Sequence, residues 1–329
     1  SYPKKPPSIR DAVRWIAIDL LPYTQKRYPP PMNTKGMFSN PRLTKALTGL
    51  SQKEFDSLLP AFEEAWHVAL KEKPNRQRKV GGGQKGKLPT PADKLAFILL
   101  YLKCYPTYDL LGFLTDRERT RCCRSVQAML PVLEKAMGRH LVLPKRKISS
   151  PEEFFSLFPE AKDVFIDGTE RRVQKPKSLK RRNRLYSGKK KTTSRKTVIV
   201  SNDQKKILLM TPAKSGRRHD KRIADKMGII QAIPWNVTIW TDTGFQGIAK
   251  EHPNTSMPVK ASKNHPLTWT QKQNNRLISG IRVMSEHAIG GYKRFKAAAD
   301  IYRNRLPNLD DTFSFLAAGL WNFHLAQAV

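Results

Sequence analysis

Apolar residues between positions 50 and 137 recur three or four residues apart, the spacing of helices with one buried face. Ser51 and Glu54 begin the first such stretch with the pattern of a capping box, and Thr90 followed by Pro91 marks a second helix start. The apolar face of the first helix comprises Phe55, Leu58, Leu59, Phe62, Trp66 and Leu70. This half of the chain is therefore predicted to be all-α.

A short helix over 108–114 and a longer one over 117–137 follow, with Thr115 or Asp116 as the cap between them. A short helix, a tight turn and a basic second helix are typical of a helix-turn-helix, whose second helix enters the DNA major groove. The arginines expected to contact DNA are Arg117, Arg121 and Arg124. A three-helix bundle with a solvated basic face shares this pattern, and it stays open as the alternative.

After residue 147 the period changes to short apolar runs, which predict strands. These runs are 164–166, 198–200, 207–210, 237–240 and 257–259, and helical stretches are expected over 219–228, 268–289 and 309–325. Asn202 and Asp203 suit a hairpin turn between the second and third strands. Strands that alternate with helices predict an α/β domain.

Four parts follow from these changes of pattern. They are an N-terminal Pro-rich arm (1–36), a helical segment with a basic Gly-rich linker (37–88), the helix-turn-helix region (89–147) and the α/β domain (148–329). The linker contains Gly81–Gly83 among many cations, which is compatible with contacts to a phosphate backbone or with a simple solvated connection.

The charge of the chain points to a polyanionic partner. Lys and Arg number 61 against 27 Asp and Glu, a net charge of +34, and such an excess repels itself unless a polyanion neutralises it. DNA is the expected partner and an anionic membrane surface is the rival. The longest apolar run, Ala96–Leu102, is far below the ~20 residues that span a bilayer. These features predict a soluble intracellular protein.

Two acids lie beside predicted strands. Asp167 directly follows the run 164–166, and Asp242 follows 238–241 in the same way. Ligands of open α/β sheets usually bind at strand ends, and two neighbouring carboxylates suit Mg²⁺ or Mn²⁺. Taken singly, an Asp close to a glycine is more often a turn residue.

A third acid, Glu286, lies in the long predicted helix. Arg282, Glu286 and Lys293 fall within about 40° of one helical face, at ~100° per residue. An acid between two cations can bind a metal while its neighbours bind phosphates, although a surface ion pair is the simpler alternative. Gly290 and Gly291 are able to end the helix before Lys293.

Five ordered motifs resemble the DDE endonuclease domain of bacterial insertion-sequence transposases and the related PIF/Harbinger transposases. The motifs are 166–170 (IDGTE), 186–190 (YSGKK), 215–220 (SGRRHD), 241–247 (TDTGFQG), and Asn275–Arg276 with 282–289. The resemblance covers roughly residues 45 to 325. The Tyr of the related Tyr-Arg-Glu-Lys helix signature is replaced by Ser279, while Arg282, Glu286 and Lys293 match.

The resemblance implies a fold and a reaction. The fold is an RNase H-like catalytic core, a mixed sheet flanked by helices, in which Asp167, Asp242 and Glu286 hold two Mg²⁺ (or Mn²⁺) ions. The reaction is cut-and-paste transposition by a homodimer on double-stranded DNA, namely the terminal inverted repeats and the target. At the matching pair His219–Asp220 we expect Asp220 to be a helix N-cap rather than a fourth metal ligand.

A dense basic segment lies between the first and second predicted strands. Residues 170–196 contain thirteen Lys or Arg, and we expect this segment to border the active site and bind the transposon-end backbone. With the helix cations, the DNA-binding set is Arg171, Arg172, Lys189, Lys190, Lys191, Arg282 and Lys293. The alternatives are a domesticated or regulatory DNA-binding protein without catalysis, and a structure-specific nuclease that cuts but never joins.

Overall fold

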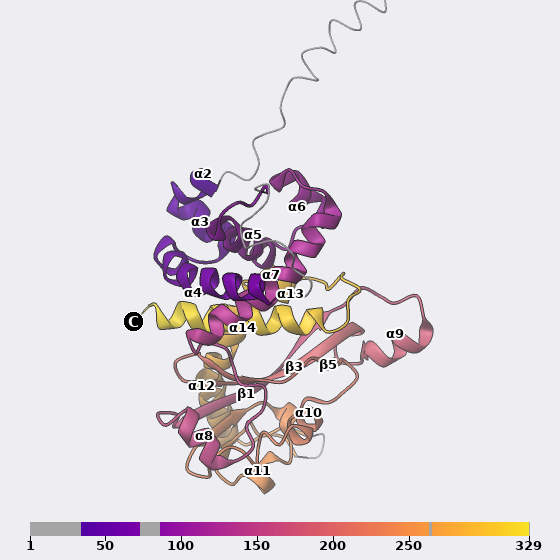
Figure 1. Ribbon diagram of the computed structural model, residues 1–329. Helices are drawn as coiled ribbons and strands as arrows, with labels where there is room; N and C mark the ends of the chain where they lie inside the picture. Colours follow the sequence, from indigo (N-terminus) through magenta and orange to yellow (C-terminus); the bar gives the residue numbers. More distant parts are fainter. Residues whose placement is uncertain (1–33, 73–85, 263–264, 329) are drawn as a thin grey trace, which may run out of the picture.

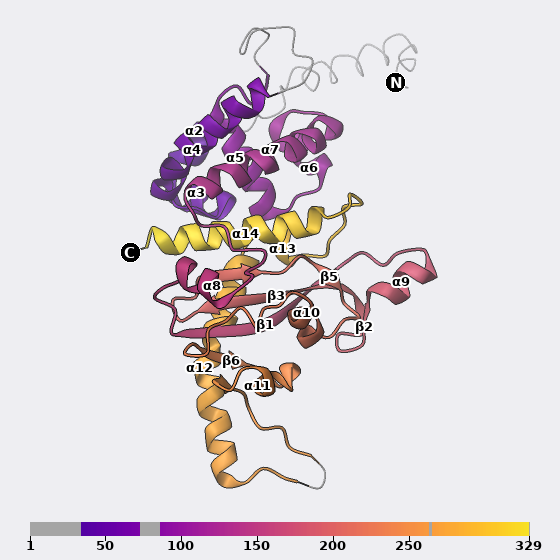
Figure 2. The same cartoon turned by 60° about the horizontal axis from the view of Figure 1, so that its bottom comes forward.

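The computed structural model describes residues 34–72, 86–262 and 265–328. The Pro-rich arm up to residue 33 and the Gly81–Gly83 part of the linker lie outside the described residues. In Figures 1 and 2 a block of helices lies on one side of the C-terminal helix, and a sheet lies on the other side.

The helical block forms where the spacing of apolar residues predicts it. Its helices are α2 (Thr34–Phe38), α3 (Pro41–Thr48), α4 (Gln52–Lys71), α5 (Pro91–Cys104), α6 (Tyr108–Thr115) and α7 (Arg119–Arg139). Both expected helix starts are confirmed, because Ser51 with Glu54 and Thr90 with Asp93 form capping boxes. Helix α4 packs on α7 and α5, and its apolar face lines the core.

The turn between α6 and α7 differs from the prediction. Helix α7 begins at Arg119 with Glu118 at its N-cap, so neither Thr115 nor Asp116 caps it. Asp116 instead ends α6 in the left-handed conformation, with φ at 49°, and its backbone N–H donates to the Gly112 carbonyl. The pair of packed helices is confirmed, and its entry into a DNA groove stays a prediction.

The strands of the described residues form one seven-stranded mixed sheet with the order β2-β3-β1-β6-β7, and β4 and β5 also pair with β3. Their bounds are β1 (Asp163–Arg172), β2 (Tyr186–Ser187), β3 (Thr192–Asn202), β4 (Ile207–Met210), β5 (Lys214–Ser215), β6 (Thr238–Thr241) and β7 (Thr255–Ser256). Strand β3 runs antiparallel to β1, whereas β6 runs parallel to β1 and β7 parallel to β6. This arrangement, with helices on both sides, confirms the RNase H-like α/β fold.

The helices around the sheet are α8 (Pro151–Leu157), α9 (Leu179–Leu185), α10 (Asp220–Lys226), α11 (Ile248–Glu251), α12 (Trp269–Lys293), α13 (Lys296–Ala299) and α14 (Leu309–Ala326), with a 3₁₀ turn, η1 (Thr243–Phe245). The hairpin at Asn202 is confirmed, since Asn202 exchanges backbone hydrogen bonds with Lys205 and Lys206 before β4 begins. The last strand was misplaced: β7 covers Thr255–Ser256 and precedes the expected run 257–259.

Helix α14 lies between the helical block and the sheet and is buried around most of its circumference. Phe313, Leu316 and Phe323 belong to the same core as α4, α5 and α7, so this core crosses the expected boundary at residue 147. The buried side chain of Asn322 accepts from the backbone N–H of Ile207 and donates to the carbonyls of Val142 and Ile207, at 2.8–2.9 Å. None of the helices in the described ranges is long and apolar enough to cross a membrane.

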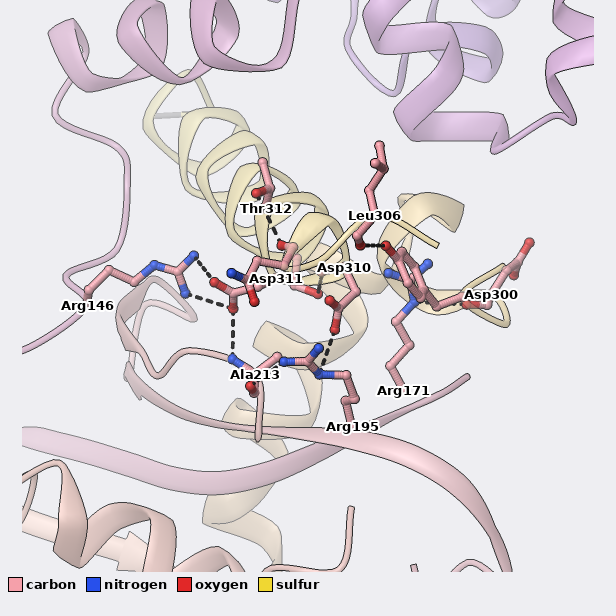
Figure 3. Close-up of polar contacts among 12 residues, drawn as sticks. Arg146, Arg171, Arg195, Ala213, Asp300, Leu306, Asp310, Asp311 and Thr312 are labelled. Atoms are coloured by element: carbon pink, nitrogen blue, oxygen red, sulfur yellow. Dashed lines mark hydrogen bonds and ion pairs between the residues drawn. The ribbon is translucent and has the colours of Figure 1, made fainter. Parts of the chain in front are cut away.

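The first turn of α14 is tied to the sheet by two carboxylates (Figure 3). Asp311 Oδ2 lies 3.0 Å from Arg146 Nη2, and its Oδ1 accepts from the Ala213 backbone N–H at 2.8 Å. Buried Asp310 forms an ion pair with Arg195 of β3 at 3.0 Å. Acidic groups at a helix N-terminus are also favoured by the helix dipole. These contacts fix the angle at which α14 crosses the sheet.

Helix α12 continues through Gly290 and Gly291 to Lys293, so the two glycines do not end it. Gly291 packs closely against Trp321 of α14. A Cβ atom at Gly291 would lie 2.3 Å from the Trp321 ring, whereas nothing lies within 4 Å of a Cβ atom at Gly290. The indole of Trp321 is held by a 2.9 Å hydrogen bond to the Lys205 carbonyl.

Two neighbouring substitutions test this packing. Gly291→Ala should lower the free energy of unfolding by about 1–3 kcal/mol, because the rigid indole leaves no space for a methyl group. Gly290→Ala should raise it by up to about 1 kcal/mol, because alanine favours the helix and meets no neighbour. Urea denaturation of both variants measures the difference, and equal effects would contradict the packing described here.

Candidate active site

Two of the three predicted acids lie side by side on adjacent strands. The parallel register of β1 and β6 pairs Ile166 with Thr241. Asp167 and Asp242 are the residues that directly follow this pair in the chain. Adjacent strands lie about 4.8 Å apart, and side chains at matched positions point to the same face. We refer to Asp167 and Asp242 as the acid pair. Helix α12 crosses the sheet beside these strands.

The acid pair does not occupy two strand ends as expected. Asp242 follows the end of β6, but Asp167 lies inside β1, which continues to Arg172. Strand β1 is longer because β3 pairs with it from Val164 to Arg172, while β6 covers only its first half. The carboxylates therefore lie where the parallel pairing stops, and the sheet continues past them on one side.

Backbone amides hold both carboxylates in place. Asp167 Oδ1 accepts from the Gly168 N–H at 2.7 Å, and Asp242 Oδ1 accepts from the Gly244 N–H at 2.9 Å. Burial and then the negative charge of Asp242 raise the pKa of Asp167 to about 6, although the Gly168 hydrogen bond and the charge of Arg282 oppose this. A bound cation would favour the charged form of the buried Asp167 carboxylate and relieve its repulsion with Asp242.

Glu286 is not brought together with the acid pair. Its side chain is exposed, next to the buried face of α12 formed by Ser285 and Ala288. No group of three or more His, Cys, Asp or Glu side chains within the described ranges is close enough to hold a metal ion. Three carboxylates in one place repel one another, and a Glu side chain with three rotatable bonds avoids this by staying in solvent.

The turn of α12 that carries Glu286 nevertheless lies near the acid pair. The charges of Arg282 and Lys293, which flank Glu286 along the helix, both interact with Asp167. Burial lowers the pKa of Lys293, while the negative charge of Asp167 opposes this effect. Glu286 follows Arg282 by about one helical turn, so the two residues lie on the same side of α12.

A fourth acid, Asp220, lies near the acid pair and is not the helix N-cap that we expected from the sequence. The N-cap of α10 is His219, and Asp220 is the first helical residue. A Cβ atom on Gly168 would lie 2.5 Å from Asp220 Cγ, so this glycine is required for the contact. Sequence reasoning also missed Lys196, whose Nζ lies 3.4 Å from Asp220 Oδ1 and 3.3 Å from Glu170 Oε1. The signal that could have identified Lys196 is its cross-strand pairing with Glu170. That pairing can be recognised only when the register between β1 and β3 is known.

Two of the arginines assigned to DNA contact are structural. Arg171 is 7% exposed, donates to the Asp300 carbonyl at 2.9 Å, and lies 5.1 Å from the Tyr302 ring centroid. Arg117 is half-buried, lies 5.5 Å from the Phe97 ring centroid, and donates to Ser125 Oγ at 2.9 Å. The contacts of Arg171 and Arg117 are thus within the protein, and the burial of Arg171 differs from the exposed position expected of a DNA contact.

The remaining candidates lie where DNA can reach them. Arg121 and Arg124 are exposed on α7, and Arg282 and Lys293 are partly exposed on α12. Among the cations from the end of β1 to the start of β3, the predicted DNA contacts Arg172, Lys189, Lys190 and Lys191 are all exposed. This segment folds as the end of β1, helix α9 and strand β2, and α9 projects from the body of the protein (Figure 1).

Comparison with known proteins agrees with this geometry. Residues 166–322, from the residue before Asp167 to Asn322 within α14, match the family described as DDE superfamily endonuclease. This region is a DDE superfamily endonuclease domain. A "Probable transposase for insertion sequence element IS702" from Microchaete diplosiphon is 26% identical over 287 residues, which cover 87% of this chain and 95% of that protein. No solved structure gives a significant match.

Membership of the superfamily implies that the DDE endonuclease domain depends on a divalent metal ion. The acid pair fits such an ion, because its ligands are carboxylate oxygens and because the repulsion that raises the pKa of Asp167 would be relieved by a cation.

The neighbouring residues Arg171 and Arg172 provide a matched test of the two roles of cations. Arg171→Gln should lower the free energy of unfolding by about 2–3 kcal/mol, because it removes a buried hydrogen bond and a cation–π contact. Arg172→Gln should change stability by less than about 0.5 kcal/mol and reduce the salt dependence of DNA binding by about one charge. The opposite assignment of effects in denaturation and salt-titration experiments would contradict these placements.

The buried ion network also predicts a large effect. Lys196→Met should lower the free energy of unfolding by about 3–5 kcal/mol, since Glu170 and Asp220 would lose their shared cation. Lys190→Met, at an exposed position nearby, should have little effect on thermal denaturation. A Lys196→Met protein as stable as the wild type would show that the network does not hold this part of the domain together.

Proposed function

We propose that this chain is a DNA transposase that cuts and joins DNA strands at the acid pair. The observation that carries the proposal is the placement of Asp167 and Asp242 on adjacent strands of a DDE endonuclease domain, beside a helix with Arg282 and Lys293. The relative that spans most of the chain is named a probable transposase, which favours transposition over hydrolysis alone.

In this proposal Asp167, Asp242 and Glu286 hold two Mg²⁺ or Mn²⁺ ions. Such ions would supply activation of the attacking oxygen and stabilisation of the leaving oxygen. Glu286 turns from solvent toward the acid pair when DNA is bound, while Arg282 and Lys293 hold the phosphates on either side of it. Water as the nucleophile produces a nick, and a DNA 3′-hydroxyl produces a joined strand.

The rest of the molecule positions double-stranded DNA. Exposed Arg121 and Arg124 on α7 would contact DNA as part of a helix-turn-helix. Arg172 and Lys189–Lys191 would bind the backbone of the transposon end close to the acid pair. Two ends must be handled together, so a homodimer forms on the terminal inverted repeats and then binds the target. The expected location is the bacterial cytoplasm, on nucleoid DNA.

An assay with the DNA that flanks the coding sequence of this chain tests the proposal. Labelled end DNA, an unlabelled target and Mg²⁺ should give both nicked and joined products. Asp167→Asn should reduce both by at least about a hundredfold, because interactions worth several kcal/mol in the transition state are lost, while DNA affinity is retained. Asp203→Asn, an exposed acid in the β3–β4 turn, is the matched control and should remain active.

The product pattern separates the alternatives. Nicks without joined strands would identify a nuclease, and binding without products would identify a DNA-binding protein that lacks catalysis. Cleavage retained in Asp167→Asn would remove that residue from the active site.

A further inference from the structure

Three cavities adjoin one another around the short strand β2. The first, of about 630 Å³, is lined by Tyr186, Lys189 and Arg217, among others. The second, of about 440 Å³, shares Tyr186 with the first. The third, of about 500 Å³, shares Arg172 and Lys191 with the second. Because neighbouring cavities share lining residues, they lie side by side along the protein surface, and we call the three together the basic groove.

One end of the basic groove opens beside the acid pair. Its first cavity is lined by Gly244, whose backbone N–H holds the Asp242 carboxylate. The same cavity is lined by Asp220, which packs on Gly168 directly after Asp167. A strand whose phosphate lies at the acid pair can therefore continue into the groove.

The lining of the groove suits a polyanion. Its cations include Arg172, Arg182, Lys189, Lys191, Arg217 and Arg218. The two acids in the lining, Glu170 and Asp220, both form ion pairs with buried Lys196, which balances one of their two negative charges. The net field in the groove is positive, and a nucleic-acid backbone is the complementary ligand.

Tyr186 stands between the first two cavities and is the aromatic residue that lines both of them. Its backbone is fixed by pairing with Thr193 of β3, yet 45% of the residue is exposed. An exposed aromatic ring within a basic channel is the arrangement that stacks unpaired bases, since every base offers a π-face. Bases inside an intact duplex are already stacked and paired, so their faces are not available to stack on this ring.

We propose that the basic groove binds an unpaired DNA strand that leaves the acid pair, with one of its bases stacked on Tyr186. The inference rests on the proposed function, because it takes DNA as the substrate of the acid pair. It adds the substrate class, which is DNA with unpaired nucleotides next to the reacting phosphate.

Binding by the full-length protein tests the inference without catalysis. The probes are a fluorescein-labelled blunt duplex of arbitrary sequence and the same duplex with an unpaired extension, placed on either strand, in buffer that contains EDTA. The wild type should prefer one of the extended duplexes. Tyr186→Ala should weaken binding of that duplex roughly tenfold and leave the blunt duplex nearly unchanged, whereas Tyr186→Phe should bind like the wild type.

A second measurement reports stacking directly. A 2-aminopurine placed in the extension should lose fluorescence on binding to the wild type and to Tyr186→Phe, but not on binding to Tyr186→Ala. Trp235→Ala removes an aromatic side chain that is even more exposed (72%) and lies before the start of β6, outside the lining of the groove, and should leave both measurements unchanged. Thermal denaturation of each variant verifies that the fold is retained.

Equal binding of blunt and extended duplexes by the wild type, or an equal loss of both with Tyr186→Ala, would overturn the inference. These results are independent of the joining assay. A protein that joins DNA but shows no Tyr186-dependent preference would leave the transposase proposal standing without the groove. A protein that shows the preference but yields no nicked or joined products would leave the groove standing without transposition.

Discussion

Burial of α14 on both of its sides is the constraint on which the rest of the structure depends. Its apolar residues complete the core of the helical block, and Asn322 and the carboxylates of its first turn attach it to the sheet. Trp321 of α14 also packs against α12 at Gly291, where only a glycine leaves space for the indole ring. The helix that carries Arg282, Glu286 and Lys293 is thus positioned by a packing contact at its C-terminal end. The geometry of the candidate site is set by apolar packing rather than by its own charges.

The large positive charge is divided between two uses. Arg171 and Lys196 are buried among aromatic rings and acids, where each compensates polar groups of the protein. Exposed cations such as Arg172, next to Arg171 in β1, and Lys191, in the turn before β3, are accessible to phosphates. Since successive strand residues point to opposite faces of the sheet, Arg171 is buried while its neighbour Arg172 is exposed. The charges of Arg282 and Lys293 act on Asp167, so cations of α12 offset part of the repulsion within the acid pair.

The sequence predicted the elements well, because helix caps and apolar spacing are local. The Ser51–Glu54 and Thr90–Asp93 caps, the turn at Asn202 and the strand before Asp242 all formed as expected. What it missed depends on contacts distant in the chain. The length of β1 beyond Asp167 comes from pairing with β3, the interior position of Arg171 from Asp300 and Tyr302, and the role of Asp220 from its contact with Gly168. The acid pair was predictable from two similar motifs, but the exposed position of Glu286 was not.

The proposed reaction requires Glu286 to join Asp167 and Asp242 around a divalent metal ion when DNA is bound. The most direct test is the structure of the full-length protein with transposon-end DNA and Mn²⁺, in which anomalous scattering locates the metal. In that structure we expect Mn²⁺ bound by the acid pair, with the Glu286 carboxylate turned inward to coordinate it. Mn²⁺ located away from the acid pair, or Glu286 still directed into solvent while DNA occupies the site, would contradict it.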